Sequence, residues 1–225
     1  MAEAYQLPLF SDISEPKPAR DEQLNVTVAR TFDVHQLNYI ARDESIYPHI
    51  SNDDSPPPEE FELYNLNTPS NYFLTIKNNN KLVGFWMLLE RSPSIYDVHT
   101  CILPEGRGQV ASLALPQALK YIFTATPAML LVTQVPASNP EARKFATWAG
   151  FKSIYTSKNS WVKDGAKYDM DVMTLPIWDW FHRLKNGDSK SKAYSLISLL
   201  AINGQFDKSQ YFYNLFVSIL GDLGA

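Results

Sequence analysis

The stretch Asp97-Val-His-Thr-Cys-Ile-Leu-Pro-Glu-Gly-Arg-Gly-Gln-Val-Ala-Ser112 combines a strand, a proline, a glycine-rich turn with one arginine, and the start of a helix. Gly106 and Gly108 allow backbone N–H groups to turn inward, and the following helix presents free N–H groups and its positive dipole end. Such a place suits a pyrophosphate. The stretch is neither a Walker loop nor a dinucleotide fingerprint, and a glycine pair before a helix is also compatible with an ordinary tight turn.

Strands and helices alternate on both sides of this stretch. Before it, apolar spacing predicts a strand over residues 25–32, a helix capped by Asp33, a loop over 51–60, and antiparallel strands over 72–76, 81–89 and 95–103. After it, the pattern predicts a helix over 110–123, a buried strand over 129–135, a helix over 140–149, strands over 151–157 and 170–175, and a helix over 177–184. This order predicts a mixed α/β domain.

Three segments organise the chain. Residues 1–24 are polar and proline-containing, which is typical of an N-terminal arm, and residues 25–186 form the α/β domain. Residues 187–225 form a C-terminal helical extension whose two helical patterns, over 194–202 and 209–220, are too apolar to stand free in water. They must pack on their own domain or on a second subunit, and we favour a homo-oligomer interface.

Composition excludes several classes of protein. The chain has 225 residues, 20 Lys and Arg against 24 Asp and Glu, and one cysteine, Cys101. No global basic field favours nucleic acid, and no disulfide framework or cysteine-rich zinc site is possible. The histidines lack metal-ligand spacing, so we expect no metal site. Without a signal sequence or an apolar run of about 18 residues, we expect a cytoplasmic protein that does not cross a membrane.

A second stretch, Val135-Pro-Ala-Ser-Asn139-Pro-Glu-Ala142-Arg-Lys-Phe-Ala-Thr-Trp-Ala-Gly150-Phe151, carries a family resemblance. A strand, an Asn, an Ala three residues later and a helix ending in Gly-Phe resemble the GNAT family of N-acetyltransferases. The first stretch resembles the acetyl-CoA loop of that family, and the similarity covers residues 25–176. More narrowly, Asp97-Val-His-Thr, Leu103-Pro-Glu and His49-Ile-Ser-Asn-Asp resemble the small acetyltransferases encoded by tailed bacteriophages.

The resemblance implies a GNAT-like α/β (α+β) fold with a mixed, mostly antiparallel central sheet flanked by helices. It also implies acetyl-CoA as acyl donor. Carried over by position, the expected acetyl-CoA-binding residues are Ile102, Leu103, Arg107, Gly108, Gln109, Val110, Ala111, Ser112 and Asn139. The sequence departs from the family where Val110 and Ser112 replace loop glycines, and where Ala146 replaces the tyrosine that often protonates the departing thiolate.

The family places an acid or a histidine on the strand before the loop to remove a proton from the amine. The catalytic candidates are His99, Asp97 and Tyr96. In a flat strand Asp97 and His99 share one face and Tyr96 lies on the other, although a bulge would change which face borders the cleft. His99 is the best proton acceptor near neutral pH, and a structural histidine is the alternative interpretation.

The resulting hypothesis is an acetyl-CoA-dependent N-acyltransferase in which an amine attacks directly in a ternary complex, because Cys101 is expected to be buried. The acceptor is a small molecule, a modified nucleobase or a protein amine. The acidic loop over residues 53–60 is either a solvated loop or a means of attracting a cationic substrate. If the chain is phage-encoded, its location is the host cytoplasm. The alternative hypothesis is a catalytically degenerate GNAT-fold interaction or virion-associated protein.

Overall fold

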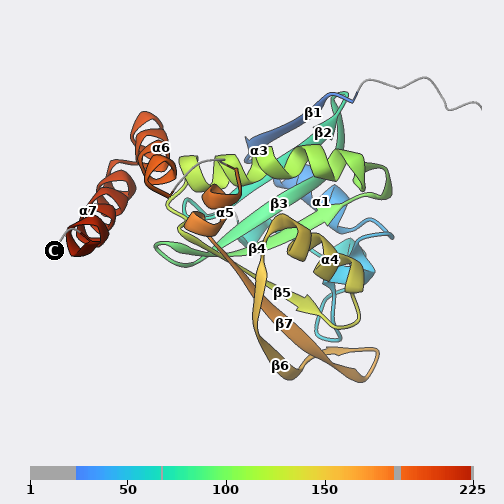
Figure 1. Cartoon of the computed structure of the whole chain (residues 1–225). Coiled ribbons are helices and arrows are strands. Elements are labelled where there is room, and N and C mark those ends of the chain that lie inside the picture. The colour runs from blue at the N-terminus through green and yellow to red at the C-terminus, as the bar shows by residue number, and fades with distance from the viewer. Residues whose placement is uncertain (1–23, 67, 185–188, 224–225) are drawn as a thin grey trace, which may run out of the picture.

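Seven strands form one sheet in the order β1-β2-β3-β4-β5-β7-β6 (Figure 1). The structure is a computed structural model that describes residues 24–66, 68–184 and 189–223. The strands are β1 (Val26–Thr31), β2 (Tyr72–Asn78), β3 (Lys81–Ser92), β4 (Ile95–Ile102), β5 (Leu130–Pro136), β6 (Lys152–Lys163) and β7 (Ala166–Pro176). All neighbours pair antiparallel except β4 and β5, which are parallel.

The helices are α1 (Val34–Ala41), α2 (Tyr47–Ile50), α3 (Gln109–Ala125), α4 (Pro140–Ala149), α5 (Ile177–Leu184), α6 (Ser189–Ile202) and α7 (Phe206–Leu223). Short 3-10 turns span Pro58–Glu60, Tyr64–Leu66 and Pro104–Gly106. The expected mixed, mostly antiparallel sheet flanked by helices is confirmed. No helix within the described ranges is both long enough and apolar enough to cross a membrane.

The sheet splits between β4 and β5. The two strands pair only where Ile95–Asp97 meets Leu130–Val132. Beyond that point β5 stays paired with β7 along its length, while β4 continues beside β3 to Ile102. The strands therefore diverge, and Figure 1 shows β5, β6 and β7 turning away from β4. The divergence leaves one edge of β4 without a strand partner over residues 98–102.

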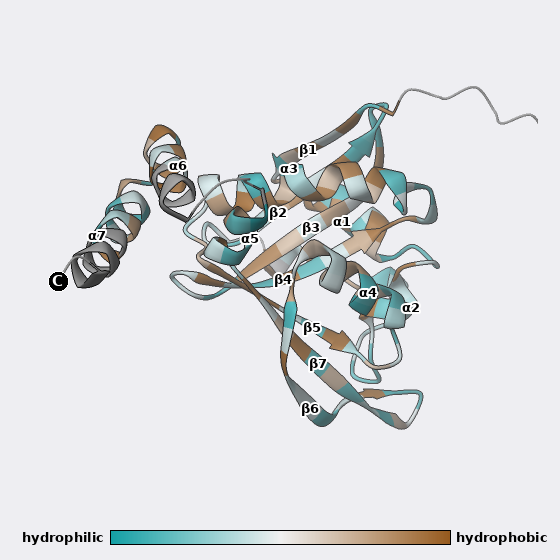
Figure 2. Cartoon of the chain, viewed as in Figure 1, coloured by the Kyte–Doolittle hydropathy of each residue, from teal (hydrophilic) through white to brown (hydrophobic). Residues whose placement is uncertain are grey.

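Each face of the sheet carries its own core. One core lies under α3, α4 and α5 and includes Trp86, Phe123 and Leu131; the other lies under α1 and includes Leu37 and Phe85. Figure 2 shows hydrophobic residues along β5 and β7. The two cores pack the central strands between helices. This packing fixes the positions of β4 and β5 where they diverge.

Local sequence signals explain several helix ends. The side chain of Asp33 accepts hydrogen bonds from the amides of His35 and Gln36 and so caps α1. The side chain of Asn139 accepts from the Ala142 amide at 3.1 Å, and α4 ends at Gly150, whose φ is 107°. The α4 boundaries predicted from these residues are confirmed.

The fold differs from the prediction in the β6–β7 hairpin and at α2, and the two C-terminal helices are longer than predicted. β6 and β7 are longer than expected, because register shifts between Ser153 and Tyr155 and between Ser157 and Trp161 interrupt the alternation in β6. The four-residue helix α2 was not predicted, because it is too short to show an apolar period and contains Pro48.

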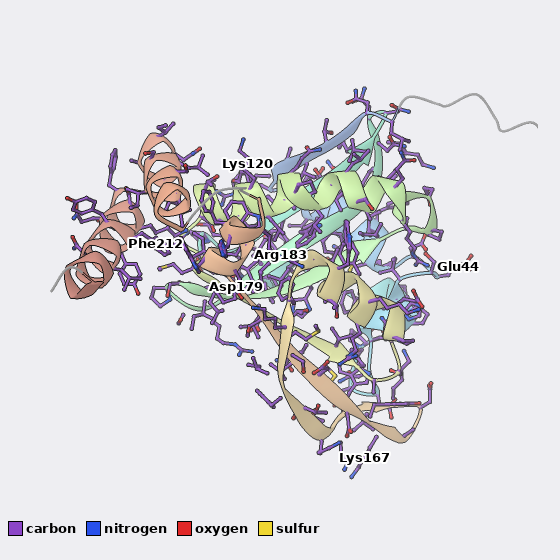
Figure 3. All side chains as sticks on the ribbon, in the orientation of Figure 1. Glu44, Lys120, Lys167, Asp179, Arg183 and Phe212 are labelled. Carbon is purple, nitrogen blue, oxygen red and sulfur yellow. The ribbon has the colours of Figure 1, made fainter. Side chains whose placement is uncertain are left out.

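The C-terminal extension packs on its own domain along one side. Leu196 and Leu200 are fully buried and Phe212 is 8% exposed in the core that contains Trp180 and Phe181. Figure 3 shows Phe212 on the side of α7 toward the domain. The preference for a subunit interface is therefore wrong for this side of the helices, since a partner within the chain already covers it.

The other side of the extension remains exposed. Its apolar members are Ile202, Phe206, Tyr211, Tyr213 and Leu215. The side chains of Phe216, Ile219 and Leu220, which belong to the same sequence pattern, and residues 1–23 of the expected arm lie outside the described residues. An oligomer through the exposed side stays a prediction.

Candidate functional site

A cavity of about 870 Å³ opens where β4 and β5 diverge. It gathers residues from α2, β4, the loop before α3, β5, α4, β6 and β7, which lie far apart in the sequence. Concave sites of this size at a break in a sheet are typical ligand sites. The two sequence stretches singled out above border the same cavity.

The N-terminus of α3 forms one end of this cavity. The first intrahelical bond runs from the Ser112 amide to the Gly108 carbonyl at 3.0 Å, so the amides of Gln109, Val110 and Ala111 precede it and point out of the helix end. Gly108 has φ 65° and ψ −118°, a conformation that favours glycine. Together with the helix dipole, these amides make an anion-binding end.

Arg107 adds a positive charge beside these amides. Its Nε donates to the Ile102 carbonyl at 3.1 Å and its Nη2 donates to the Ser45 carbonyl at 3.2 Å. These bonds hold the guanidinium between β4 and the segment before α2 while it lines the cavity. An arginine fixed in this way suits a phosphate group.

The structure brings some of the expected cofactor residues to the cavity. Those that line it are Ile102, Arg107, Gly108, Ala111 and Asn139. The cavity lining does not include the side chains of Leu103, Gln109, Val110 and Ser112.

The four expected residues that do not line the cavity have other positions in the fold. Leu103 is buried, and its amide donates to the Val83 carbonyl at 2.9 Å. Gln109 is exposed in the first turn of α3, and the Ser112 hydroxyl donates to the Gly108 carbonyl at 2.9 Å. Val110 is buried in the core as an ordinary helical residue. The β-branched side chain of Val110 therefore needs no positive φ, so a valine is tolerated where the resembling family has a glycine.

Of the three catalytic candidates, only His99 lines the cavity. β4 keeps a regular register with β3 from Ile102 to Tyr96, so no bulge changes its faces near the cavity. Asp97 lies where β4 still pairs with β5, and its carboxylate forms an ion pair with Arg91 at 2.8 Å.

Tyr96 is placed in the core under α3. Its ring is 1% exposed and meets Tyr72 edge to face at 5.9 Å. Burial raises the pKa of Tyr96 to about 12. Tyr96 is a packing residue in this fold, because the alternation of β4 turns it away from the face that carries His99.

His99 is an exposed residue on β4 that lines the cavity. Burial lowers the pKa of its imidazole, and the nearby Asp97 carboxylate acts in the opposite direction. Because the lowering prevails, the imidazole is neutral at pH 7 and can accept a proton.

Sequence reasoning quoted His49 only as part of a family resemblance and did not place it at the site, although it lies on α2 and lines the same cavity. It also missed Gln134 of β5 and Trp161 of β6. Only the tertiary fold brings these residues together, since α2 and the shifted part of β6 were not visible as periodic patterns.

The wall formed by α4 is apolar. It presents Ala142, Phe145, Ala146 and Ala149 to the cavity, followed by Phe151. Ala146 is 7% exposed and places a methyl group where the resembling family has a tyrosine hydroxyl. This wall suits an extended thioester chain but supplies no proton at residue 146.

A clamp joins the segment after α2 to the β6–β7 hairpin. The Asp53 carboxylate accepts from the amides of Asp164, at 2.6 Å, and Gly165, at 2.9 Å, and the Asp53 amide donates to the Val162 carbonyl. Lys163 Nζ donates to the carbonyls of Pro48 and Ser51. The clamp fixes His49 relative to β6 and uses the Asp53 carboxylate for structure.

Within the part of the chain that the structure describes, no group of three or more His, Cys, Asp or Glu side chains could hold a metal ion. Cys101 is buried on β4, and burial raises the pKa of its thiol to about 12.

Solved structures with a similar fold include spermidine N-acetyltransferases. The enzyme from Vibrio cholerae in complex with CoA and spermine has a TM-score of 0.58 and 19% identity, over 70% of this chain and 98% of that chain. A chimera of the Vibrio cholerae enzyme with hSSAT has a TM-score of 0.56 and 19% identity, over 67% and 95%. A dodecameric Vibrio cholerae structure has a TM-score of 0.55 and 19% identity, over 71% and 98%.

No protein-family model matches the sequence, and no curated protein matches it. The structural likeness establishes the fold, which is the GNAT acetyltransferase fold.

Proposed function

We propose that the chain is an acetyl-CoA-dependent N-acetyltransferase that acts on an amine. The observation that carries this proposal is the cavity at the split between β4 and β5, with the N-terminus of α3 at one end and His99 on its wall. The fold shared with N-acetyltransferases supports the same reaction class by analogy.

The residues present fit acetyl-CoA. The amides of residues 109–111 and the guanidinium of Arg107 would hold its phosphates. The unpaired edge of β4 over residues 98–102 offers backbone groups to amides of the pantetheine arm, and the α4 wall offers apolar contact. When bound, acetyl-CoA supplies an acetyl group activated as a thioester.

His99 would make the amine nucleophilic. An amine is mostly protonated at neutral pH and must lose a proton before it attacks a carbonyl carbon. The neutral imidazole of His99 accepts that proton, directly or through water. The Cys101 thiol is buried and its pKa is raised, so it is mostly protonated at neutral pH and a poor nucleophile, which supports direct attack over a covalent relay.

Ala146 gives weight to a second hypothesis. Since this position supplies no hydroxyl, protonation of the leaving sulfur would depend on water in the cavity. A chain that keeps the fold as an interaction or virion-associated protein, without catalysis, would tolerate this loss. The bacteriophage resemblance, the cytoplasmic location and the acceptor type stay predictions from the sequence.

Acetyl-CoA binding and turnover distinguish these hypotheses. Ligand at about 100 times its dissociation constant should stabilise the folded chain by about 2.7 kcal/mol, which a thermal shift detects. Binding with release of CoA thiol in the presence of an amine supports the enzyme. Binding without turnover on any amine supports the second hypothesis, and the absence of binding contradicts the proposed cofactor.

We also propose a homo-oligomer through the exposed side of α6 and α7. Ile202 is 83% exposed and Phe206 is 69% exposed, and one neighbouring structure is described as dodecameric. Light scattering should give a mass above that of a monomer, and Phe206→Glu should reduce it because a carboxylate cannot be buried in an apolar contact. A monomeric full-length chain at micromolar concentration contradicts this proposal.

A further inference from the structure

The cavity passes through the sheet from one face to the other. On β4, Val98 and Ile102 pack with the core under α3, whereas Cys101 packs with the core under α1. Because side chains alternate along a strand, His99 lies on the α1 face together with Cys101. The amides at the N-terminus of α3 lie at the end of the cavity that Arg107 borders, and on the α1 face residues of α2 line the cavity.

Residues of β6 and β7 line the same part of the cavity as α2. Met173 and Leu175 belong to the core under α3, so Met170 lies on the α1 face by alternation. Trp161 pairs with Tyr168, two residues before Met170, and therefore shares that face. We define the α2 mouth as the part of the cavity lined by Ile46, His49, Ile50, Gln134, Trp161 and Met170.

The α2 mouth is mostly apolar, and no carboxylate lines it. Ile46 is 5% exposed and Met170 is 7% exposed, and the Trp161 ring is half-buried beside them. Its polar side chains are the imidazole of His49 and the amide of Gln134. The hydroxyl of Ser160, next to Trp161, also lines the cavity. A second ammonium group on the acceptor would lose its hydration here without gaining a counter-charge.

Carboxylates near this mouth have other roles. Among the described residues that line the cavity, the one carboxylate belongs to Glu141, in the first turn of α4, where it pairs with Lys144 at 2.7 Å. Asp53 of the acidic loop is bound by the amides of the β6–β7 turn, and the Lys163 ammonium lies in the same clamp. The Asp53 carboxylate is therefore engaged in the clamp, and no carboxylate of the acidic loop lines the cavity at the α2 mouth.

From these contacts we infer that the acceptor is a monoamine with an aromatic or aliphatic body, held against Trp161, and not a polyamine. The inference rests on the proposed function, because the α2 mouth is the acceptor side only if acetyl-CoA enters beside α3. It separates this chain from the Vibrio cholerae enzyme of the same fold, which was solved with CoA and spermine.

The test uses the full-length chain saturated with CoA, with 2-phenylethylamine and spermidine as probes. Calorimetry should show phenylethylamine binding at least about tenfold more tightly than spermidine. With acetyl-CoA, thiol release should give a kcat/KM for phenylethylamine at least about tenfold higher. Equal or better binding of spermidine, or binding of neither amine, overturns the inference.

Three variants localise the effect. Trp161→Ala should weaken phenylethylamine binding about tenfold, because it removes the aromatic contact. Tyr155→Ala, an exposed ring on the same strand that does not line the cavity, should leave binding unchanged. Ser160→Asp should improve spermidine binding by supplying the missing carboxylate.

If Trp161→Ala and Tyr155→Ala behave alike, the inference is wrong even when phenylethylamine is the better substrate. Failure of the proposed function has a different signature, since the chain would then show no thermal shift with acetyl-CoA at all.

Discussion

The imidazole of His99 is the group whose protonation the proposed reaction depends on. A general base works only when it is unprotonated, so kcat/KM should fall as the pH falls through its pKa. Burial places that pKa below the ordinary value of 6.5, and we expect the acidic limb of the pH–rate profile below pH 6.5. His99→Gln should lower kcat by roughly a hundredfold and remove the limb.

His49→Gln is the matched control for this prediction. His49 lines the same cavity from α2, and its loss should change the KM of the acceptor while the acidic limb persists. Wild-type turnover in His99→Gln would make His99 a structural residue and leave proton removal to water.

Arg107 carries the charge at the phosphate end. Arg107→Glu should weaken acetyl-CoA binding by more than about tenfold, because a negative charge replaces a positive one beside phosphate. Lys120→Glu makes the same charge change on the outer side of α3, away from the cavity (Figure 3), and should leave affinity nearly unchanged. Calorimetry measures the acetyl-CoA affinity of both variants. If both lose the same affinity, the effect comes from the overall charge of the protein and not from the position of Arg107.

At the scale of single residues, the sequence predicted where charge and glycine are needed but not which side chains face the cavity. Arg107, Gly108 and Asn139 were predicted and line it, whereas Tyr96 was a candidate and is buried in the core. Which of Tyr96 and His99 faces the cavity depends on whether β4 contains a bulge. A bulge depends on how β4 pairs with β3, and no local sequence pattern encodes that pairing.

At the scale of elements, boundaries were predicted well where a side chain or glycine ends a helix. Asp33, Asn139 and Gly150 act locally, so their effects are readable from the sequence. The hairpin of β6 and β7 was underestimated, because the irregular register of β6 is set by its neighbour strand and by the clamp from Asp53.

The role of the N-terminus of α3 in cofactor binding can be tested by comparing substitutions at two glycines. Gly108 and Gly165 both have positive φ, 65° and 71°, and a Cβ at either would meet no atom within 4 Å. Changing either to alanine should cost about 1–2 kcal/mol of unfolding free energy through backbone strain alone. Only Gly108→Ala should also weaken acetyl-CoA binding, because it alters the amides at the helix end.

Thermal unfolding and calorimetry on both variants check this prediction. If Gly165→Ala, in the β6–β7 turn, weakened acetyl-CoA binding as much as Gly108→Ala, loss of stability would explain both effects. The N-terminus of α3 would then have no special role in binding.

At the scale of the whole molecule, the sequence showed that the C-terminal helices need a partner but not which one. An apolar pattern records the need for burial, and the same leucines would suit a neighbouring domain or a second subunit. Lys208 shows that one side of these helices packs on the domain of the same chain. Its ammonium donates to the carbonyls of Phe123, Thr126 and Ala128, at 3.1, 2.7 and 2.7 Å, and so caps the C-terminal end of α3.

This contact couples the extension to the fold and to pH. Burial lowers the pKa of Lys208 from 10.5 to about 8. Between these values the unfolded chain binds the proton more tightly than the folded chain. The contribution of Lys208 to stability is therefore greatest above pH 10.5 and is lost as the pH falls through about 8.

Lys208→Met should remove this pH dependence. At pH 7 it should also lower the free energy of unfolding by about 2 kcal/mol, because it leaves buried carbonyl oxygens without a donor. Denaturant unfolding between pH 7 and pH 10 should show a difference between wild type and variant that grows as the pH rises, whereas Lys120→Met, on the exposed side of α3, should show no such growth. A constant difference would mean that Lys208 keeps its proton in the folded chain, because the carbonyl oxygens at the end of α3 stabilise the ammonium enough to offset its burial.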